Sequence, residues 1–198
     1  MSKFIPAHKS DTLFIVFTAS ITPKSIEDFM DTLSKSVSPT TRTLYILFTT
    51  GGGDVSAGVA FYTLLKGLPY QVTMHNIGNV DSIGNIVFFA GDKRYATAEA
   101  SFLIHPISNN AREGAVHATE LKSLLNSIEE NEKRMRTLYE RYTRLPKKDF
   151  DKYFHVSGSR KDSTFALQNG MIDEIREIRL PPFGKNLVTI VTSPPEQD

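Results

Sequence analysis

Short apolar runs alternate with helical stripes along the first half of the chain. Runs rich in β-branched and aromatic residues, each bounded by polar residues, predict buried strands at 12–18, 44–49, 71–77 and 101–104. Thr22 and Pro23 are typical of a helix start, and apolar residues follow at helical spacing over 26–37. Residues 55–68 are apolar nearly all round, which indicates an interior helix. Alternating strands and helices predict parallel pairing with right-handed crossovers, and ligands in such sheets bind at the carboxyl ends of strands.

Helices dominate the second half. Residues 78–81 predict a turn that ends a strand, and residues 82–90 predict a buried helix that begins at Ser82. A long helix over about 116–142 carries an apolar stripe close to a seven-residue repeat. Shorter helices are predicted after Pro146 and over 162–170, and further strands from Met171 and over 187–192. We expect a single α/β domain over residues 1–186 and a C-terminal strand and tail over residues 187–198.

Composition narrows the function classes. The 198 residues carry a formal net charge of +1 and no cysteine, which excludes disulfides, thiolate zinc sites and a cysteine nucleophile. The first nine residues lack an apolar signal-peptide core, and no apolar run approaches the ~18 residues that a membrane span needs. The histidines show no metal-ligand spacing, and the near-neutral charge gives no electrostatic reason for nucleic-acid binding. We expect a cytoplasmic protein that uses no metal, cofactor, nucleic acid or membrane.

Three features fall at predicted carboxyl ends of strands. The first is the glycine turn at 51–53, which lacks the Gly-Lys-Ser/Thr end of a phosphate loop and the third glycine of a dinucleotide site. Three successive glycines indicate that a ligand approaches the backbone, whose N–H groups could stabilise an oxyanion. A tight turn that needs left-handed backbone angles is the alternative interpretation.

The other two features are Ser82 and His105. Ser82 follows the turn at 78–81, an arrangement similar to a nucleophile elbow, although Val80 occupies the first glycine position of G-x-S-x-G. His105 ends an apolar strand, at the carboxyl end where ligands bind in such sheets. The alternatives are a helix cap for Ser82 and a hydrogen-bonded structural role for His105.

Several segments, taken in order, resemble the proteolytic subunit of Clp protease, a serine peptidase family on the crotonase-like fold. Residues 50–58 (TGGGDVSAG) are similar to its Ser-Pro-Gly-Gly turn and following V-x-A-G. Residues 78–84 (GNVDSIG), 88–91 (FFAG), 103–106 (LIHP) and 169–173 (NGMID) resemble its G-x-A-A-S-M-G, Ala-Gly, M-I-H-Q-P and Y-G-L-V-D segments. The helix over 116–142 matches its long handle helix. The resemblance covers about Asp11 to Ile175.

This resemblance implies a stack of βαβ units with a protruding handle helix. It implies that Ser82 attacks the peptide carbonyl while His105 takes its proton and passes it to the leaving amine. The N–H groups of Gly53 and Ile83 would form the oxyanion hole. It further implies peptide or unfolded polypeptide substrates and self-assembly into rings, two stacked heptamers in the family.

The sequence departs from the family at three places. Counting back without gaps, the family's catalytic aspartate falls on Gly158; the nearest acid, Asp162, is the tentative third member, although a helix N-cap is the favoured interpretation. Asp81, directly before the nucleophile, would oppose catalysis if its carboxylate faced the oxyanion. The N-terminal segment is shorter than the family's, which counts against docking to an ATPase unfoldase.

Two other function classes stay open. A crotonase-type enzyme acting on an acyl-coenzyme A thioester would share the fold, but such enzymes use paired carboxylates, and Asp54 and Asp81 form no recognisable pair. A non-catalytic scaffold would account for the missing aspartate. The apolar stripe of the long helix favours self-association, with an ordinary core-packed helix as the alternative.

Overall fold

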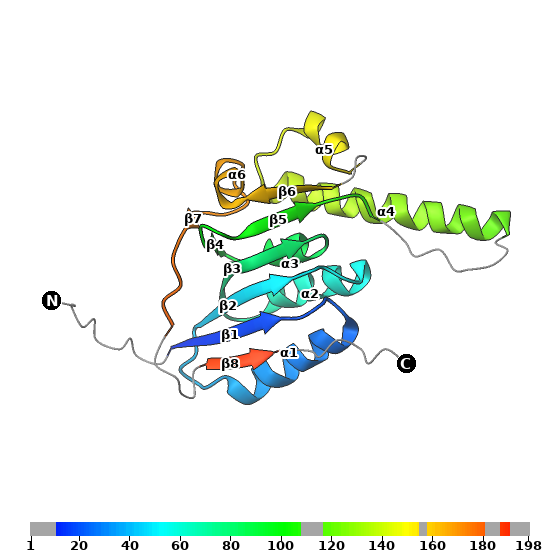
Figure 1. Ribbon diagram of the computed structural model, residues 1–198. Coiled ribbons are helices and arrows are strands. Elements are labelled where there is room, and N and C mark those ends of the chain that lie inside the picture. The colour runs from blue at the N-terminus through cyan, green and yellow to red at the C-terminus, as the bar shows by residue number, and fades with distance from the viewer. Residues whose placement is uncertain (1–10, 108–116, 155–157, 181–186, 191–198) are drawn as a thin grey trace, which may run out of the picture.

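A mostly parallel sheet runs through the computed structural model, which describes residues 11–107, 117–154, 158–180 and 187–190 (Figure 1). Its strands in these ranges are β1 (Thr12–Thr18), β2 (Thr43–Thr50), β3 (Gln71–Asp81), β4 (Lys93–Ala96), β5 (Ser101–Ile104), β6 (Ser159–Asp162), β7 (Glu174–Ile175) and β8 (Leu187–Ile190). The main path is β6-β5-β3-β2-β1-β8, and β4 pairs with β3 and β7. The β5–β6 pair is antiparallel and the other pairs are parallel. The predicted parallel α/β sheet is therefore confirmed.

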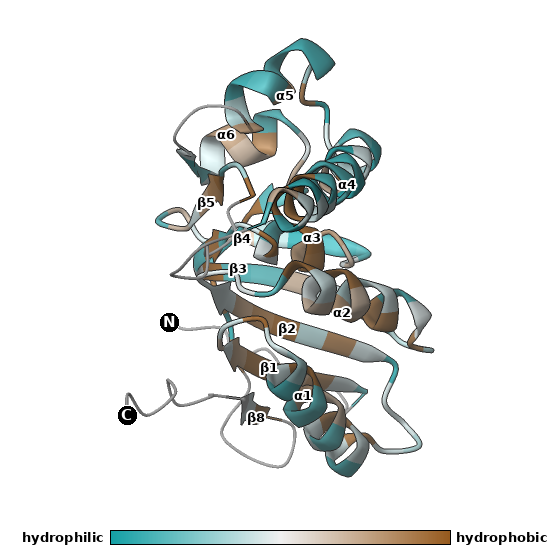
Figure 2. Ribbon diagram, turned by 90° about the vertical axis from the view of Figure 1, so that its right-hand side faces the viewer, coloured by the Kyte–Doolittle hydropathy of each residue, from teal (hydrophilic) through white to brown (hydrophobic). Residues whose placement is uncertain are grey.

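The helices gather mainly on one face of this sheet. They are α1 (Pro23–Ser36), α2 (Val55–Gly67), α3 (Gly84–Phe88), α4 (Ala118–Tyr142), α5 (Lys147–Phe154) and α6 (Ser163–Gln168). Figure 2 shows α1, α2, α3 and α4 on the same side of the sheet, and Figure 1 shows α5 and α6 near β6.

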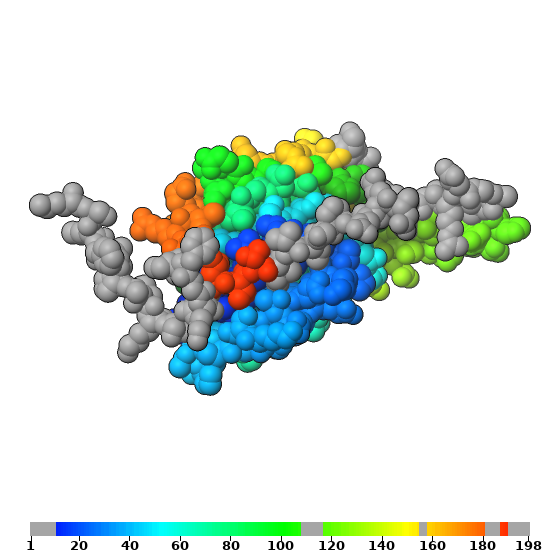
Figure 3. All heavy atoms as spheres, turned by 60° about the horizontal axis from the view of Figure 1, so that its bottom comes forward, coloured from blue at the N-terminus to red at the C-terminus, as the bar shows by residue number. Residues whose placement is uncertain are grey.

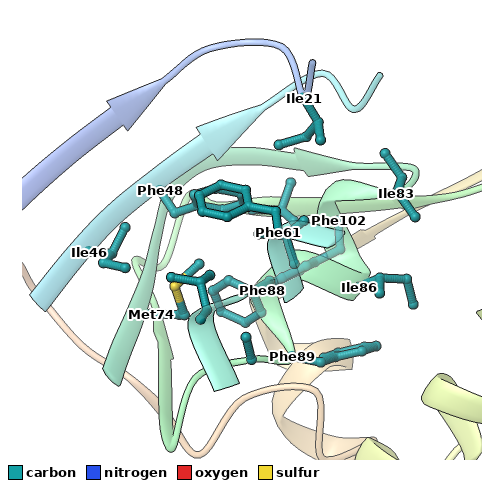
Figure 4. Close-up of a cluster of buried hydrophobic side chains, with 14 of the residues drawn as sticks. Ile21, Ile46, Phe48, Phe61, Met74, Ile83, Ile86, Phe88, Phe89 and Phe102 are labelled. Carbon is teal, nitrogen blue, oxygen red and sulfur yellow. The ribbon is translucent and has the colours of Figure 1, made fainter. Parts of the chain in front are cut away.

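The core lies between the sheet and these helices. Along β1, Leu13, Ile15 and Phe17 are buried, whereas the residues between them are only half-buried, as expected for a strand with one covered face. Phe17 stacks on Phe48 with ring centroids 5.2 Å apart, and Phe61 from α2 packs in the same cluster (Figure 4). Burying each such side chain contributes roughly 1.5–3 kcal/mol, so this layer fixes the strand ends that carry the site.

Local signals predicted several boundaries correctly. β1 and β5 occupy the predicted residues, and α1 begins after Thr22, whose hydroxyl accepts a hydrogen bond from the Ser25 N–H in a capping box. The helix α4 covers most of the predicted long helix; Val116 lies outside the described residues. β8 pairs with β1 at the edge of the sheet, where Figure 3 shows it in red.

Several predicted boundaries are wrong, among them the strand predicted from Met171, because β7 begins only at Glu174. β3 does not end at Ile77: it continues through Gly78 to Asp81 because it exchanges β4 for β5 as its neighbour and shifts register against β2. Gly78 permits this close approach, since a Cβ there would lie 3.1 Å from the Thr49 hydroxyl oxygen. The helix predicted to begin at Ser82 begins two residues later, at Gly84. The short strands β4 and β6 were not predicted, because neither has a strong apolar run.

The handle helix α4 extends far beyond the sheet (Figure 1). Its buried side chains, Met135 and Tyr139, belong to its second half, where Tyr139 packs on Phe89, just after α3, and on Phe150 of α5. In its first half Leu121 and Leu125 are 54% and 55% exposed. No helix in the described ranges is both long enough and apolar enough to cross a membrane.

Candidate active site

Ser82 leaves the end of β3 in a left-handed backbone conformation. Its φ is 56°, and it is the only non-glycine residue with positive φ in the described part of the chain. Its N–H donates a 3.0 Å hydrogen bond to the carbonyl of Leu103 on β5. Such a conformation costs on the order of 1–3 kcal/mol and is concentrated at functional sites. The sharp turn from strand to helix is the geometry of a nucleophile elbow.

The glycine turn lies against this serine. Gly52 is buried with φ 91°, and a Cβ placed on it would lie 2.7 Å from the Ser82 Cβ. Only glycine permits that approach. The Gly52 carbonyl accepts a 2.8 Å hydrogen bond from the N–H of Ile21, which holds the turn to the end of β1. The structure therefore brings together two of the features that the sequence placed at strand ends.

Two backbone N–H groups beside Ser82 are available as donors. Gly53 follows the buried Gly52, and Ile83 follows Ser82 at the entry to α3. Within the residues that the structure describes, neither N–H donates a hydrogen bond to another protein group. Unpaired N–H groups at such a position can stabilise a developing oxyanion.

His105 lies just beyond the end of β5, two residues after Leu103, whose carbonyl holds the Ser82 N–H. Ser82 and His105 thus leave adjacent parallel strands at the same edge of the sheet. The His105 Nδ1 lies 2.6 Å from the carbonyl oxygen of Pro106. Because a carbonyl only accepts, this contact places the proton on Nδ1 and leaves Nε2 as the acceptor of the ring.

Gly158 occupies the position beside the base where the family's acid was expected. A Cβ on Gly158 would lie 2.5 Å from the His105 Cβ and 3.1 Å from the Ile104 carbonyl oxygen. The adjacent Ser159 begins β6 opposite Ile104. The backbone of this position is therefore in place, but no side chain extends from it toward the imidazole.

Asp162 lies at the other end of β6. It pairs with Ser101, and its carboxylate accepts a 2.7 Å hydrogen bond from the Phe165 N–H as the N-cap of α6. The structure does not bring it to His105, which stands at the opposite end of the β5–β6 ladder. Asp162, the tentative third catalytic residue, is therefore a helix N-cap and does not contact His105.

Asp81 is held by an arginine that sequence reasoning missed. Its carboxylate oxygens lie 3.0 and 2.9 Å from the two terminal nitrogens of Arg160 on β6. One of those nitrogens also donates to the Ser101 hydroxyl at 2.7 Å. The link crosses β5, because Asp81 and Arg160 both pair with Leu103 from opposite sides. It was not predictable while β6 itself went unrecognised.

A second missed residue is Asn85. Its side-chain amide donates to the Ser82 carbonyl at 3.0 Å and to the Leu103 carbonyl at 2.9 Å. The side chain is fully buried, and its Oδ1 has no hydrogen-bond partner among the described residues. A lone asparagine inside the apolar run at 82–90 was the visible signal. It ties the nucleophile turn to the strand that carries the histidine.

The described ranges contain no cluster of side chains that could bind a metal ion. No group of three or more histidine and carboxylate side chains in these ranges is placed to hold a metal ion. The buried His75 is engaged at both ring nitrogens, with the Tyr45 hydroxyl at 2.8 Å and the Arg176 carbonyl at 3.0 Å. Burial lowers its pKa. His75 is therefore a structural histidine on the other face of the sheet from the core cluster.

Comparison with known proteins agrees with this fold. The family model described as Clp protease matches residues 9–179. The ATP-dependent Clp protease proteolytic subunit of Deinococcus radiodurans is 27% identical over 134 residues, which are 63% of this chain and 60% of that protein. Subunit 1 from Leifsonia xyli subsp. xyli is 33% identical over 66 residues, 32% of this chain and 34% of that protein. These alignments thus span less than two thirds of either relative.

A solved structure gives the same architecture. A mutant of ClpP1 from Listeria monocytogenes superposes with a TM-score of 0.70 at 21% identity, covering 86% of this chain and 93% of that chain. At that identity the likeness concerns the fold. Because the family model spans most of the sequence, the chain belongs to the Clp protease family.

Proposed function

We propose that this chain is a serine peptidase that hydrolyses peptide bonds through Ser82 and His105. One observation carries the proposal: Ser82 stands in a strained left-handed turn, against the glycine turn and one strand from His105. An ordinary helix cap needs neither the positive φ nor the packing on Gly52. Family membership supports the same chemistry.

The reaction is a two-step acyl transfer. The Ser82 Oγ attacks the scissile carbonyl while the Nε2 of His105 takes its proton, and the imidazolium then protonates the leaving amine. The N–H groups of Gly53 and Ile83 bind the oxyanion of the tetrahedral intermediate. Water, activated by the same imidazole, hydrolyses the acyl-enzyme and regenerates Ser82.

The Pro106 carbonyl takes the orienting role of the absent acid. Its contact with Nδ1 selects the tautomer that the reaction needs. A neutral carbonyl stabilises the imidazolium less than a carboxylate does. We therefore expect a slow peptidase whose turnover lies well below that of a complete triad.

The substrate class and the assembly follow from the same proposal. Peptides or unfolded polypeptides are the expected substrates. The chain is expected to self-assemble through the exposed leucines of α4. Ring assembly of stacked heptamers and a cytoplasmic location stay predictions. The whole-protein activity is inferred, because the relatives are matched over only part of their length.

A fluorophosphonate probe tests the nucleophile directly. The probe should label the folded chain, and peptide mapping should place the adduct on Ser82. The Ser82→Ala variant should not react, whereas Ser101→Ala, which changes a serine on the neighbouring strand, should still be labelled at Ser82. Absence of labelling between pH 6 and pH 9 would favour the scaffold instead.

A further inference from the structure

A negative charge directly before a serine nucleophile is a problem for the proposed reaction. Asp81 is the residue before Ser82, and the transition state places a new negative charge on the carbonyl oxygen that Ser82 attacks. A carboxylate within one residue opposes that charge, the more so because only 13% of the Asp81 side chain is exposed to solvent. The chain therefore needs a way to neutralise Asp81.

Arg160 supplies that counter-charge. Two parallel hydrogen bonds of 3.0 and 2.9 Å join its guanidinium to both carboxylate oxygens, the geometry that fixes direction as well as charge. The Ser101 hydroxyl, which donates to the Asn79 Oδ1 at 2.8 Å, accepts a third hydrogen bond from the same guanidinium. Arg160 is thus anchored on β3 and β5 at once.

Stability alone does not account for this pair. The Arg160 side chain is 47% exposed, and pairs with that much solvent contact contribute about 0–1 kcal/mol. Asp81 and Arg160 also both pair with Leu103, the residue whose carbonyl accepts a hydrogen bond from the Ser82 N–H. Its position beside the nucleophile turn, rather than its strength, is the feature to explain.

We propose that Arg160 is a positioning residue, which turns the Asp81 carboxylate away from Ser82 and cancels its charge. The inference rests on the proposed function, since it concerns the oxyanion of that reaction. The other titratable groups of the neighbouring described elements are Lys161 and Asp162 on β6 and His105 after β5. Lys161 lies over the Tyr153 and Phe165 rings, Asp162 caps α6, and α3 (Gly84–Phe88) contributes no titratable side chain. The harm in losing Arg160 is then the exposed negative charge and not the lost link between strands.

A double-mutant cycle separates the effect of the exposed Asp81 charge from the effect of the lost link between strands. The rate of fluorophosphonate labelling and the kcat and KM for a fluorogenic peptide are measured for Arg160→Gln, Asp81→Asn and the double variant. Arg160→Gln should lower kcat and the labelling rate about 10- to 100-fold with little change in KM. Asp81→Asn and the double variant should stay within about threefold of the wild type, because neither retains the carboxylate.

Controls keep the outcomes distinct. Lys161→Gln removes a positive charge from the neighbouring residue, whose ammonium lies over the Tyr153 and Phe165 rings, and should leave the rates unchanged. Thermal unfolding followed by circular dichroism checks the fold of every variant. If Arg160→Gln does not fold, the double variant is compared with Asp81→Asn.

If the double variant is as slow as Arg160→Gln, Arg160 acts as a structural link between strands and the proposal is overturned. Where Arg160→Gln does not fold, a double variant slower than Asp81→Asn leads to the same conclusion. An Arg160→Gln variant with wild-type rates would also overturn the proposal. A wild-type chain that fails to react at Ser82 would overturn the proposed function itself, and the role of Arg160 with it.

Discussion

Gly158 packs directly against His105, with room for no side chain between them: a Cβ on Gly158 would lie 2.5 Å from the His105 Cβ. The absence of a carboxylate at this position is therefore built into the backbone packing. Restoring an aspartate here would displace the histidine rather than complete a triad. The site has to be understood with the Pro106 carbonyl as the orienting group.

We predict that Gly158→Ala lowers peptide turnover at least tenfold, because the added methyl group pushes His105 away from Ser82. The clash is with the Cβ of His105 and not with the far end of a flexible side chain, so the free energy of unfolding should also fall, by about 1–3 kcal/mol. The measurement is kcat/KM for a fluorogenic peptide beside urea unfolding. Ser159→Ala, one residue further along β6, is the matched control and should keep the wild-type rate. Wild-type turnover by Gly158→Ala would contradict the packing argument.

Asn85→Ala should reduce both stability and reactivity. The change removes two side-chain hydrogen bonds, to the carbonyls of Ser82 and Leu103, which keep only their backbone donors; at roughly 0.5–1.5 kcal/mol for each bond, the loss is about 1–3 kcal/mol. Asn85→Asp should cost more, since a carboxylate would face two carbonyl oxygens. Urea unfolding and the labelling rate measure the two effects. Asn79→Ala, which removes an exposed carboxamide on β3, should cost well under 1 kcal/mol; equal losses for Asn79 and Asn85 would refute the bridging role.

The buried His75 should make folding stability depend on pH. Burial lowers its pKa in the folded chain, so the unfolded chain binds the proton more readily. The contribution of neutral His75 is complete above about pH 6.5, the ordinary histidine value, and is lost as the pH falls below it. Unfolding free energies at pH 7.5 and pH 5.5 should therefore differ more for the wild type than for His75→Gln. His117→Gln, at an exposed histidine, should keep the wild-type difference, and an undiminished difference in His75→Gln would count against this account.

Leu125→Glu should weaken self-association. The side chain is 55% exposed on a helix that extends beyond the sheet, and a second copy of the chain would bury it. Light scattering coupled to size-exclusion chromatography gives the mass in solution. Ser123→Glu adds the same charge two residues away, outside the stripe, and should leave the mass unchanged. A wild-type chain that stays monomeric at high concentration would refute assembly through the handle.

Local sequence signals predicted the strands and helices whose apolar runs are strong. β1 shows this, because its alternating burial matches its sequence, and so does α1 with its Thr22 cap. β6 was missed because Ser159–Asp162 carries no apolar residue and is held by pairing with β5. The continuation of β3 through Gly78 also depends on its partners, since a single glycine signals a break when it is considered alone.

The site was predictable in part for the same reason. Ser82, His105 and the glycine turn each end a strand, and the order of strands in the sheet brings them together. Arg160 and the Pro106 carbonyl act through contacts that only the antiparallel β5–β6 ladder and the backbone after β5 create. No spacing along the chain encodes those contacts.

The measurement that tests the central claim most directly is a double-mutant cycle on Ser82 and His105, read as kcat/KM for a fluorogenic peptide. If the two side chains act as one unit, Ser82→Ala and His105→Ala should each abolish nearly all hydrolysis, and the double variant should be no slower than either single one. Additive losses, or hydrolysis that survives Ser82→Ala, would contradict the proposed pair.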